Sequence, residues 1–290
     1  MPLRIGTRGS ALALVQARWV AAQLSGDVDA VEVVEITTAG DRGQDVGDKA
    51  RWVSALEAAL LEDRVDVAVH SAKDVPGELA PGTVIAAVPA RESSADVLVG
   101  ARGPRIGTAS LRRAAQLRAL DPTLEVRELR GNVDTRLRKL DAGEVDGLVL
   151  AAAGLDRLGV TRERVVLDLV PAPGQGALAL QTRTERAGAV AALSDPDALA
   201  AVTAERALAS ALGASCHTAM GAQARRAGGS DTAELELTGW VGLPDGSEWI
   251  TDTLVGHPDL VAAELAARMI AVGARELLVR AAALDTGVAQ

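Results

Sequence analysis

The chain has 290 residues, of which 48% are hydrophobic and 24% are charged, and its formal net charge is −9. This length is too great for one comfortable hydrophobic core and indicates two or three domains. Only 1% of the residues are aromatic. An acidic chain with so few stacking side chains does not fit a nucleic-acid-binding protein, so we expect no nucleic-acid partner.

Neither a membrane span nor an export signal is visible in the sequence. No uncharged run approaches the length of a transmembrane helix, and the first residues, M-P-L-R-I-G-T, read directly as a strand. The single cysteine, Cys216, excludes an internal disulfide. We therefore expect a cytoplasmic protein without a membrane partner.

Basic residues are concentrated in one segment. Residues 101–165 carry 13 Lys and Arg against 9 Asp and Glu, a net charge of +4. The rest of the chain carries 17 against 30, a net charge of −13. One basic segment in an acidic protein favours a small anionic ligand.

Strands and helices alternate through the first half of the chain. The predicted strands are 3–7, 31–37, 65–69, 96–99, 124–127 and 147–151. The predicted helices begin after Ser10 and after residue 50, and then cover 109–120, 132–142 and 153–159. This alternation is typical of parallel sheets covered on both faces, and it predicts two α/β units in series without a detectable sequence repeat. The polar, glycine-rich stretch 39–50 is predicted to be an exposed loop.

The last third of the chain has a different pattern. V-P-A-P-G-Q-G-A at 170–177 is predicted to be a crossover, residues 178–181 a strand that returns to the first sheet, and 185–212 a helix. Beyond Cys216, alternating stretches at 233–241 and 249–255 flank a turn and predict an antiparallel sheet. The helix predicted to cover this sheet carries Val261, Leu265, Met269 and Val272 on its inner face.

These patterns predict the fold class: two α/β lobes followed by a small C-terminal α+β domain. The expected domains are residues 1–90 with 176–195, residues 95–172, and residues 199–290.

The stretch from Arg105 to Lys139 carries the strongest indication of a binding site. It reads R-I-G-T-A-S-L-R-R at 105–113 and R-E-L-R-G-N-V-D-T-R-L-R-K at 127–139. Each piece leads into a predicted helix whose first turns carry arginine. Helix N-termini bind anions, and guanidinium groups suit carboxylates or phosphates. A ligand with several negative groups is one interpretation, and a solvated basic helix face is the other.

The carboxyl ends of the predicted strands gather similar residues. Ligands of open parallel sheets bind at this edge. The predicted strand exits lie at 7–10, 70–74, 108–110, 130–132 and 153–157, and nearly all carry Arg, Lys, Ser or Thr. A cleft between two lobes is therefore expected.

Asp74 is the acid placed among these basic residues. It is either their counter-ion or a catalytic group, and in both cases nearby positive charges keep it ionised. A permanently charged aspartate can stabilise positive charge that develops on a substrate. His70 is interpreted as a packed, hydrogen-bonded histidine rather than a base.

Cys216 lies in A-L-G-A-S-C-H-T-A-M-G. A lone cysteine is most often a small buried hydrophobic residue, but the small neighbours leave room for a group attached to the sulfur. His217 and His257 make no metal-binding spacing with it, so no metal is expected.

The motifs occur in an order that resembles the porphobilinogen deaminase (hydroxymethylbilane synthase) family along the whole chain. They are T-R-G-S-A-L-A at 7–13, H-S-A-K-D-V-P at 70–76, G-T-A-S-L-R-R at 107–113, L-R-G-N-V-D-T-R-L at 129–137 and P-G-Q-G-A at 173–177.

The resemblance implies a transferase of porphyrin, tetrapyrrole and heme biosynthesis. Such an enzyme joins four porphobilinogen molecules head to tail, releases ammonia each time, and yields hydroxymethylbilane. The resemblance also implies two lobes like those of periplasmic binding proteins, a monomer, and a dipyrromethane cofactor attached to Cys216 by a thioether. The substrate carries an acetate and a propionate, which accounts for the arginine residues.

The resemblance assigns roles by motif position. Asp74 is the catalytic residue and stabilises the cationic azafulvene formed when ammonia leaves. The cofactor-binding residues are Cys216, Ser71, Lys73, Thr108, Ser110, Arg112 and Arg113. The substrate-binding residues are Arg8, Ser10, Gln16, Lys49, Arg130, Arg136, Arg157 and Gln175.

Two departures from the family pattern occur. The active-site loop reads G-D-K-A-R-W at 47–52, with Trp52 where the family has phenylalanine, and Ala214-Ser215 replaces a glycine pair before the cysteine. Two alternatives stay open: a non-catalytic two-lobe anion-binding protein, and a degenerate paralogue that binds porphobilinogen but cannot elongate it. The altered loop is the support for the second.

Overall fold

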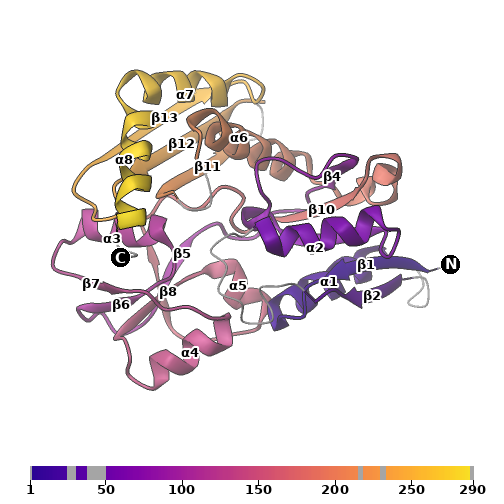
Figure 1. Cartoon of the computed structure of the whole chain (residues 1–290), viewed down its shortest axis with the longest axis horizontal. Coiled ribbons are helices and arrows are strands. Elements are labelled where there is room, and N and C mark those ends of the chain that lie inside the picture. Colours follow the sequence, from indigo (N-terminus) through magenta and orange to yellow (C-terminus); the bar gives the residue numbers. More distant parts are fainter. Residues whose placement is uncertain (1, 25–30, 38–49, 215–217, 229–232, 288–290) are drawn as a thin grey trace. The chain divides into compact units, whose positions relative to one another are not determined.

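The computed structural model describes every residue except 1, 25–30, 38–49, 215–217, 229–232 and 288–290. It forms two compact units (Figure 1): residues 1–92 with 176–200, and residues 93–175 with 201–290. The first unit contains one mixed α/β sheet, and the second contains another such sheet and a smaller antiparallel sheet. This architecture confirms the predicted fold class, whereas the predicted division into three domains stays a prediction.

The sheet of the first unit has the strand order β2-β1-β3-β10-β4. Its strands are β1 (Leu3–Thr7), β2 (Val31–Glu35), β3 (Val67–Ser71), β4 (Thr83–Ala87) and β10 (Leu178–Arg183). β1 runs parallel to β2 and β3, whereas β10 runs antiparallel to β3 and β4. The prediction that the chain returns to the first sheet after residue 177 is therefore confirmed.

Two helices cover opposite faces of this sheet. Helix α1 (Ala11–Leu24) buries Ala17 and Val20 against Val67 and Val69 of β3. Helix α2 (Ala50–Leu61) packs with Ala68, whose side chain points to the other face of the same strand. Successive residues of a strand face opposite sides, so one short apolar strand serves both helices.

The larger sheet of the second unit repeats this arrangement with the order β7-β6-β8-β5-β9. Its strands are β5 (Asp96–Gly100), β6 (Arg105–Gly107), β7 (Glu125–Arg127), β8 (Gly147–Ala151) and β9 (Arg164–Leu167). Its helices are α3 (Leu111–Leu120), α4 (Val133–Asp141) and α5 (Ala152–Arg157). β6 is parallel to β7 and β8, and β5 is antiparallel to β8 and β9.

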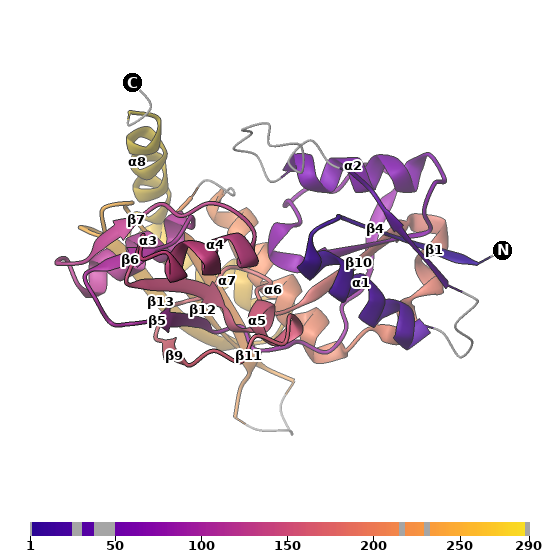
Figure 2. The ribbon, with the colours of Figure 1, turned by 90° about the horizontal axis from the view of Figure 1, so that it is seen from below.

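The third sheet is antiparallel, with the order β11-β12-β13. It comprises β11 (Met220–Arg226), β12 (Leu235–Gly242) and β13 (Trp249–Gly256), accompanied by α6 (Pro196–Leu212), α7 (Val261–Ala271) and α8 (Ala274–Gly287). At Gly239 a Cβ would meet Leu208 of α6 and Met269 of α7, so both helices pack on that face of the sheet. Trp240 faces the other way and packs against Ala115 of α3. Figure 2 shows this sheet from a second direction.

Several expectations about these elements were wrong. Neither large sheet is purely parallel, because β10 and β5 run against their neighbours. The helix predicted over 185–212 begins only at Pro196, and it is preceded by the 3-10 segments η4 (Thr184–Ala189) and η5 (Ala191–Leu193). Asp195 accepts a hydrogen bond from the backbone N–H of Ala198 (2.8 Å), which starts the helix there. Val272 lies beyond α7 and is 66% exposed.

The loop predicted at 39–50 lies outside the described residues up to position 49.

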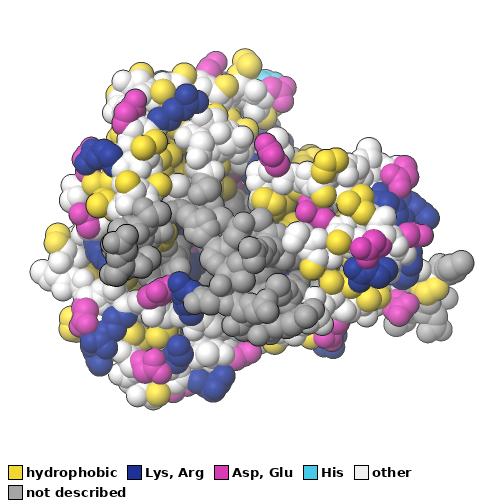
Figure 3. All heavy atoms as spheres, in the orientation of Figure 1, with side chains coloured by type: hydrophobic (Ala, Val, Ile, Leu, Met, Phe, Trp, Pro, Cys, Tyr) yellow, Lys and Arg dark blue, Asp and Glu magenta, His cyan; other side chains and the backbone are white. Residues whose placement is uncertain are grey.

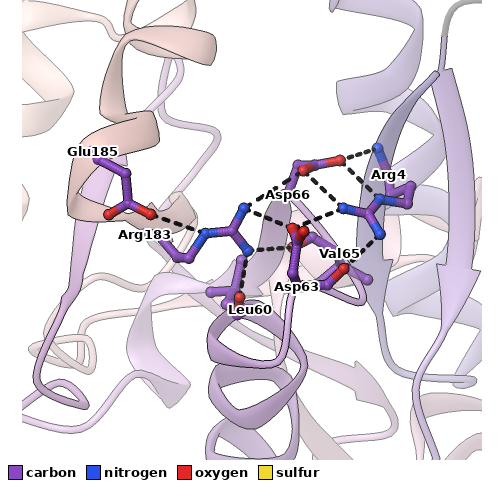
Figure 4. Close-up of polar contacts among 7 residues, drawn as sticks. All are labelled: Arg4, Leu60, Asp63, Val65, Asp66, Arg183 and Glu185. Carbon is purple, nitrogen blue, oxygen red and sulfur yellow. Dashed lines mark hydrogen bonds and ion pairs between the residues drawn. The ribbon is translucent and has the colours of Figure 1, made fainter. Parts of the chain in front are cut away.

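An arginine clamps the amino-terminal edge of the first sheet (Figure 4). The Arg4 backbone N–H and Nε both donate to Oδ2 of Asp66, at 2.9 and 3.0 Å, and Nη2 donates to Oδ1 (3.1 Å). Nη1 donates to the carbonyl oxygen of Asp63, whose φ of 56° is unusual for a residue with a side chain. Arg183 of β10 also donates to Asp63 (2.8 Å), so the clamp joins β1, β10 and the turn before β3.

The second unit contains the same clamp. The Arg105 backbone N–H donates to Oδ2 of Asp146 (2.9 Å), and its guanidinium donates to both carboxylate oxygens and to the carbonyl oxygen of Gly143 (3.2 Å). Gly143 also has a positive φ, 74°. The sequence R-I-G-T occurs at both clamps, at 4–7 and at 105–108. The two copies begin in β1 and β6, which hold the same place in the strand orders of the two sheets. The expectation that no sequence repeat links the two units was wrong.

Replacing Asp66 with asparagine should lower the free energy of unfolding by about 1–2 kcal/mol, because a charged acceptor of several hydrogen bonds is lost where water partly screens it. The hydrogen bond from Arg4 holds the pKa of Asp66 below its ordinary value. A lowered folded-state pKa contributes stability above about pH 4, and this contribution disappears as the pH falls through the folded-state value.

The check is urea unfolding of both proteins at pH 7 and at acidic pH, with Glu62→Gln as a control at an exposed neighbour. The difference between Asp66→Asn and the original chain should shrink as the pH falls, and a difference that does not change with pH would contradict the clamp.

Candidate active site

The carboxyl edge of the first sheet carries one set of predicted site residues. Arg8 and Ser10 follow β1, while Ser71 ends β3 and leads into the 3-10 turn η3 (Ala72–Asp74). Because β1 and β3 pair in parallel, both segments leave the sheet at the same edge. Arg8, Ser10, Lys73 and Asp74 are all half-buried.

Gln16 and Ser71 form a hydrogen bond at this edge. The amide nitrogen of Gln16 donates to the Ser71 hydroxyl oxygen (3.1 Å), and the hydroxyl oxygen also lies 3.3 Å from the amide oxygen. Gln16 is buried on α1, so this contact holds the helix over the end of β3. The structure thus brings together a predicted substrate-binding residue and a predicted cofactor-binding residue.

A buried polar network supports the strand that leads to Asp74. The amide nitrogen of Gln181 donates to Glu57 and to Thr83, both at 2.8 Å, so the amide oxygen of Gln181 accepts from Nε2 of His70 (3.0 Å). His70 therefore carries its proton on Nε2. Burial lowers the pKa of His70 to about 4, which keeps the ring neutral. The interpretation of His70 as a packed histidine is confirmed.

The charge of Asp74 raises the pKa of His70 and that of Arg8 lowers it, both less than burial does. Asp74 and Arg8 follow the parallel strands β3 and β1, so both lie at the same edge of the sheet.

In the second unit, β6 leads through a short turn into α3. Ser110 is the N-cap of α3, and its hydroxyl accepts a hydrogen bond from the backbone N–H of Arg113 (3.4 Å). The buried Thr108 hydroxyl accepts from the backbone N–H of Ser110 (3.2 Å). The cap places Arg112 and Arg113 in the first turn of the helix.

These two arginines do not lie in solvent. Arg112 is 4% exposed and Arg113 5%, and both pair with Asp96, which is 0% exposed. Oδ1 of Asp96 lies 2.9 Å from Nε and 2.7 Å from Nη2 of Arg113, and Oδ2 lies 2.8 Å from Nη1 of Arg112. Burial alone would raise the pKa of Asp96, but the charges of Arg113 and Arg112 outweigh it and hold the pKa far below its usual range.

The N–H groups of Arg112 and Arg113 that do not contact Asp96 differ in their hydrogen bonding. Nη1 of Arg113 donates to the carbonyl oxygen of Val149 (3.1 Å), and Nη1 of Arg112 donates to that of Val170 (2.7 Å). Within the described part of the chain, Nε of Arg112 is buried without a hydrogen-bond partner. Burial lowers the pKa of Arg112, and the charge of Asp96 opposes the shift.

Gln175 belongs to the same cluster. Its amide nitrogen donates to Oδ1 of Asp96 (2.8 Å) and to the carbonyl oxygen of Ser94 (2.7 Å), and its amide oxygen accepts from Nη2 of Arg113 (3.4 Å). These contacts hold the guanidinium of Arg113 from a third side. The role of Gln175 in substrate binding stays a prediction.

The other predicted arginines lie along the same edge of this sheet. Arg130 follows β7 and is exposed beside Glu128, Arg136 is half-buried on α4, and Arg157 is the last residue of α5. Figure 3 shows several basic side chains over the region of α4 and β7, with acidic side chains between them. The basic segment is therefore interleaved with acids, and its buried arginines stand apart from its exposed ones.

Two predicted residues, Lys49 and Cys216, lie outside the described residues. Among those described, no group of three or more His, Cys, Asp or Glu is placed to hold a metal ion. No helix in the same part of the chain is both long and apolar enough to cross a membrane.

Two family models match the chain. The one described as "Porphobilinogen deaminase, dipyromethane cofactor binding domain" covers residues 3–191, and the one described as "Porphobilinogen deaminase, C-terminal domain" covers residues 199–271. The chain belongs to the porphobilinogen deaminase family.

Bacterial relatives named porphobilinogen deaminase match nearly the full chain. The protein of Deinococcus deserti is 44% identical over 94% of this chain and 97% of its own length. The protein of Chromobacterium violaceum is 44% identical over 94% and 96%, and that of Nocardia farcinica 41% over 99% and 90%. Among solved structures, the periplasmic aliphatic sulphonate binding protein SsuA from Escherichia coli matches with a TM-score of 0.36 and 14% identity, over 72% of this chain and 70% of its own.

The cofactor that the porphobilinogen deaminase family implies fits the residues of the second unit. A dipyrromethane bears carboxylate groups, and the α3 edge offers guanidinium and hydroxyl donors suited to carboxylates. The buried Nε of Arg112, without a partner among the described residues, is a donor of the kind such a ligand needs.

Proposed function

We propose that the chain is a porphobilinogen deaminase, a transferase that joins four porphobilinogen molecules into hydroxymethylbilane and releases ammonia at each step. The observation that carries the proposal is the match to the family over 3–191 and 199–271. The basic side chains at the carboxyl edges of both large sheets support it, because substrate and product carry several carboxylates. They are Arg8 and Lys73 in the first unit, and Arg112 and Arg113 in the second.

In the proposed enzyme, most of the cofactor-binding residues belong to the second unit. Arg112 and Arg113 bind its carboxylates from the first turn of α3, and Thr108 and Ser110 lie in the turn before them. Cys216 is the point of covalent attachment. When bound, the dipyrromethane supplies the primer to which the first substrate is joined.

The first unit supplies the charge that the reaction needs. Loss of ammonia leaves positive charge on the substrate, and Asp74 stabilises it as a fixed carboxylate. Arg8 follows β1 at the same edge of the sheet and contributes a positive charge there. Ser71 and Lys73, which precede Asp74 at the end of β3 and in η3, bind cofactor carboxylates in the proposal.

The remaining substrate-binding residues hold the acetate and propionate groups of the growing chain. They are Ser10, Gln16, Lys49, Arg130, Arg136, Arg157 and Gln175.

The wider properties of the proposed enzyme are a monomeric state, a cytoplasmic location, three domains, and no metal, membrane or nucleic-acid partner. They follow from the sequence and the family resemblance.

The test of the proposed function is the intact mass of the purified protein. Chain produced where porphobilinogen is available should exceed its sequence mass by two linked pyrrole units. Cys216→Ala should show no excess, since it lacks the thiol that forms the thioether. Met220→Leu, a change to a buried sulfur-containing residue at the start of β11, should keep the excess.

Each other outcome points to a different protein. An unmodified mass in the original chain would favour the non-catalytic anion-binding protein. A loaded chain that consumes no porphobilinogen would favour the degenerate paralogue.

A further inference from the structure

Asp96 is the one acidic side chain, among the described residues, that pairs with Arg112 or Arg113. Two guanidinium groups and one carboxylate leave the buried cluster with one excess positive charge. An excess charge in a buried site is costly unless a counter-ion or polar partners accompany it. The carbonyl oxygens of Val149 and Val170 and the amide oxygen of Gln175 partner some of these N–H groups, and a ligand carboxylate would offset the excess charge.

The two arginines have different constraints. Arg113 is fixed by Asp96, by the carbonyl oxygen of Val149 and by Gln175. Arg112 meets Asp96 through an ionic contact of 2.8 Å, and no described residue donates an aligned hydrogen bond to Oδ2 of Asp96. The carboxylate thus locks Arg113 and holds Arg112 by charge, and the buried Nε of Arg112 has no hydrogen-bond partner among the described residues.

The first unit provides an internal comparison. Ser10 caps α1 through the backbone N–H of Ala13 (3.3 Å), as Ser110 caps α3 through that of Arg113. Leu12 and Ala13 therefore occupy the positions that Arg112 and Arg113 occupy in the second unit.

The position of Asp96 can be compared between the two units in the same way. Asp96 pairs across the sheet with Ala151, the last residue of β8, whereas Leu178 pairs with Ser71, the last residue of β3. Leu178 thus stands where Asp96 does in the other sheet. The unit with two arginines in the first turn of the helix has the aspartate, and the unit without them has a leucine.

We propose that Asp96 is a positioning residue: it holds the guanidinium groups of Arg112 and Arg113 in the arrangement that receives the carboxylates of the cofactor. This inference rests on the proposed function. Without the carboxylate, two adjacent buried cations repel each other, and neither keeps the geometry that a two-pronged hydrogen bond to a carboxylate requires.

The test measures cofactor loading rather than turnover. Apo-protein made without porphobilinogen is mixed with porphobilinogen, and the fraction with the added mass of the cofactor is followed over time by intact-mass spectrometry. Asp96→Asn should load at least tenfold more slowly than the original chain. The thermal midpoint of each apo-protein is measured as well, and loading is compared at a temperature well below all of these midpoints.

Asp146→Asn is the matched control. It removes an aspartate that pairs with an arginine on the same sheet, but at the opposite edge, beside Arg105. It should lower the thermal midpoint and load at the rate of the original chain. Gln175→Met keeps Asp96 but removes the hydrogen bond that Gln175 donates to it, together with those to the Ser94 carbonyl oxygen and from Arg113. It should slow loading about threefold and serves if Asp96→Asn does not fold.

The outcomes separate the two levels of inference. If the original chain never acquires the mass, the proposed function fails. If the original chain loads, and folded Asp96→Asn or Gln175→Met loads equally fast, the positioning role fails. Equal slowing in Asp96→Asn and Asp146→Asn, in proportion to lost stability, would reduce Asp96 to a purely structural residue.

Discussion

Replacing Asp74 with asparagine should leave a folded chain whose turnover falls by about 10²–10³-fold, the size of effect seen when one electrostatic group that stabilises a transition state is removed. Asparagine keeps the shape of the side chain and loses its charge. Since the charge is what offsets the positive charge on the substrate, kcat should fall far more than the affinity for porphobilinogen.

The measurement is steady-state release of ammonia by loaded protein, together with the thermal midpoint and the intact mass. Glu78→Gln is the matched control, an exposed acid four residues further along the chain, and it should turn over normally. A kcat for Asp74→Asn within a factor of three of the original would exclude the charge-stabilisation role. A loss of the cofactor mass would instead place Asp74 in cofactor assembly.

Local patterns in the sequence were sufficient for much of the fold. β1, α1 and α3 follow from a short apolar run, a capping serine and helical spacing, all of which involve residues close in the chain. The site edge also follows from local information, because Thr108, Ser110 and Asp74 come directly after strands. The family resemblance then supplied roles that no spacing gives.

What the sequence did not predict depends on contacts between distant residues. Asp96 pairs with arginines 16 and 17 positions later, and its signal, an acid at the head of the apolar run D-V-L-V, is also compatible with a loop end. The Arg4–Asp66 and Arg105–Asp146 clamps span 62 and 41 positions. Such pairs become visible only when the strands are placed side by side.

The antiparallel strands were hidden for a similar reason. β10 pairs with β3 more than a hundred residues earlier, and an apolar run such as L-A-L-Q-T-R is equally compatible with either strand direction. The direction of such a strand depends on its place in the sheet and on its connections, not on its sequence of apolar residues.

The two clamps and the site occupy opposite edges of their sheets. Arg4 and Arg105 fix the edge where β1 and β6 begin, and the predicted binding residues follow the edge where these strands end. A rigid connection at one edge leaves the loops at the other edge to carry function. Stability and ligand binding can therefore be changed separately, and this separation makes Asp146→Asn a suitable control.

Arg113→Leu should destabilise the chain strongly, by about 3–5 kcal/mol, because it leaves the fully buried Asp96 without its main partner. Arg112→Leu should cost less stability, since its contact with Asp96 is a single ionic one and its Nε has no partner among the described residues. The Val170 carbonyl oxygen, to which Arg112 also donates, keeps its hydrogen bond from Gln116. Both variants should load the cofactor poorly, but for different physical reasons.

Urea unfolding of the apo-proteins and loading followed by intact mass distinguish these reasons. Arg112→Leu should show near-normal unfolding and at least tenfold slower loading, which would assign its effect on loading to a lost ligand contact rather than to lost stability. Arg113→Leu should show both defects, and the double variant Asp96→Asn/Arg113→Leu should recover part of the lost stability without recovering loading, because the unpaired buried charge has been removed. Equal stability losses in the two single variants would contradict the asymmetry seen around Asp96.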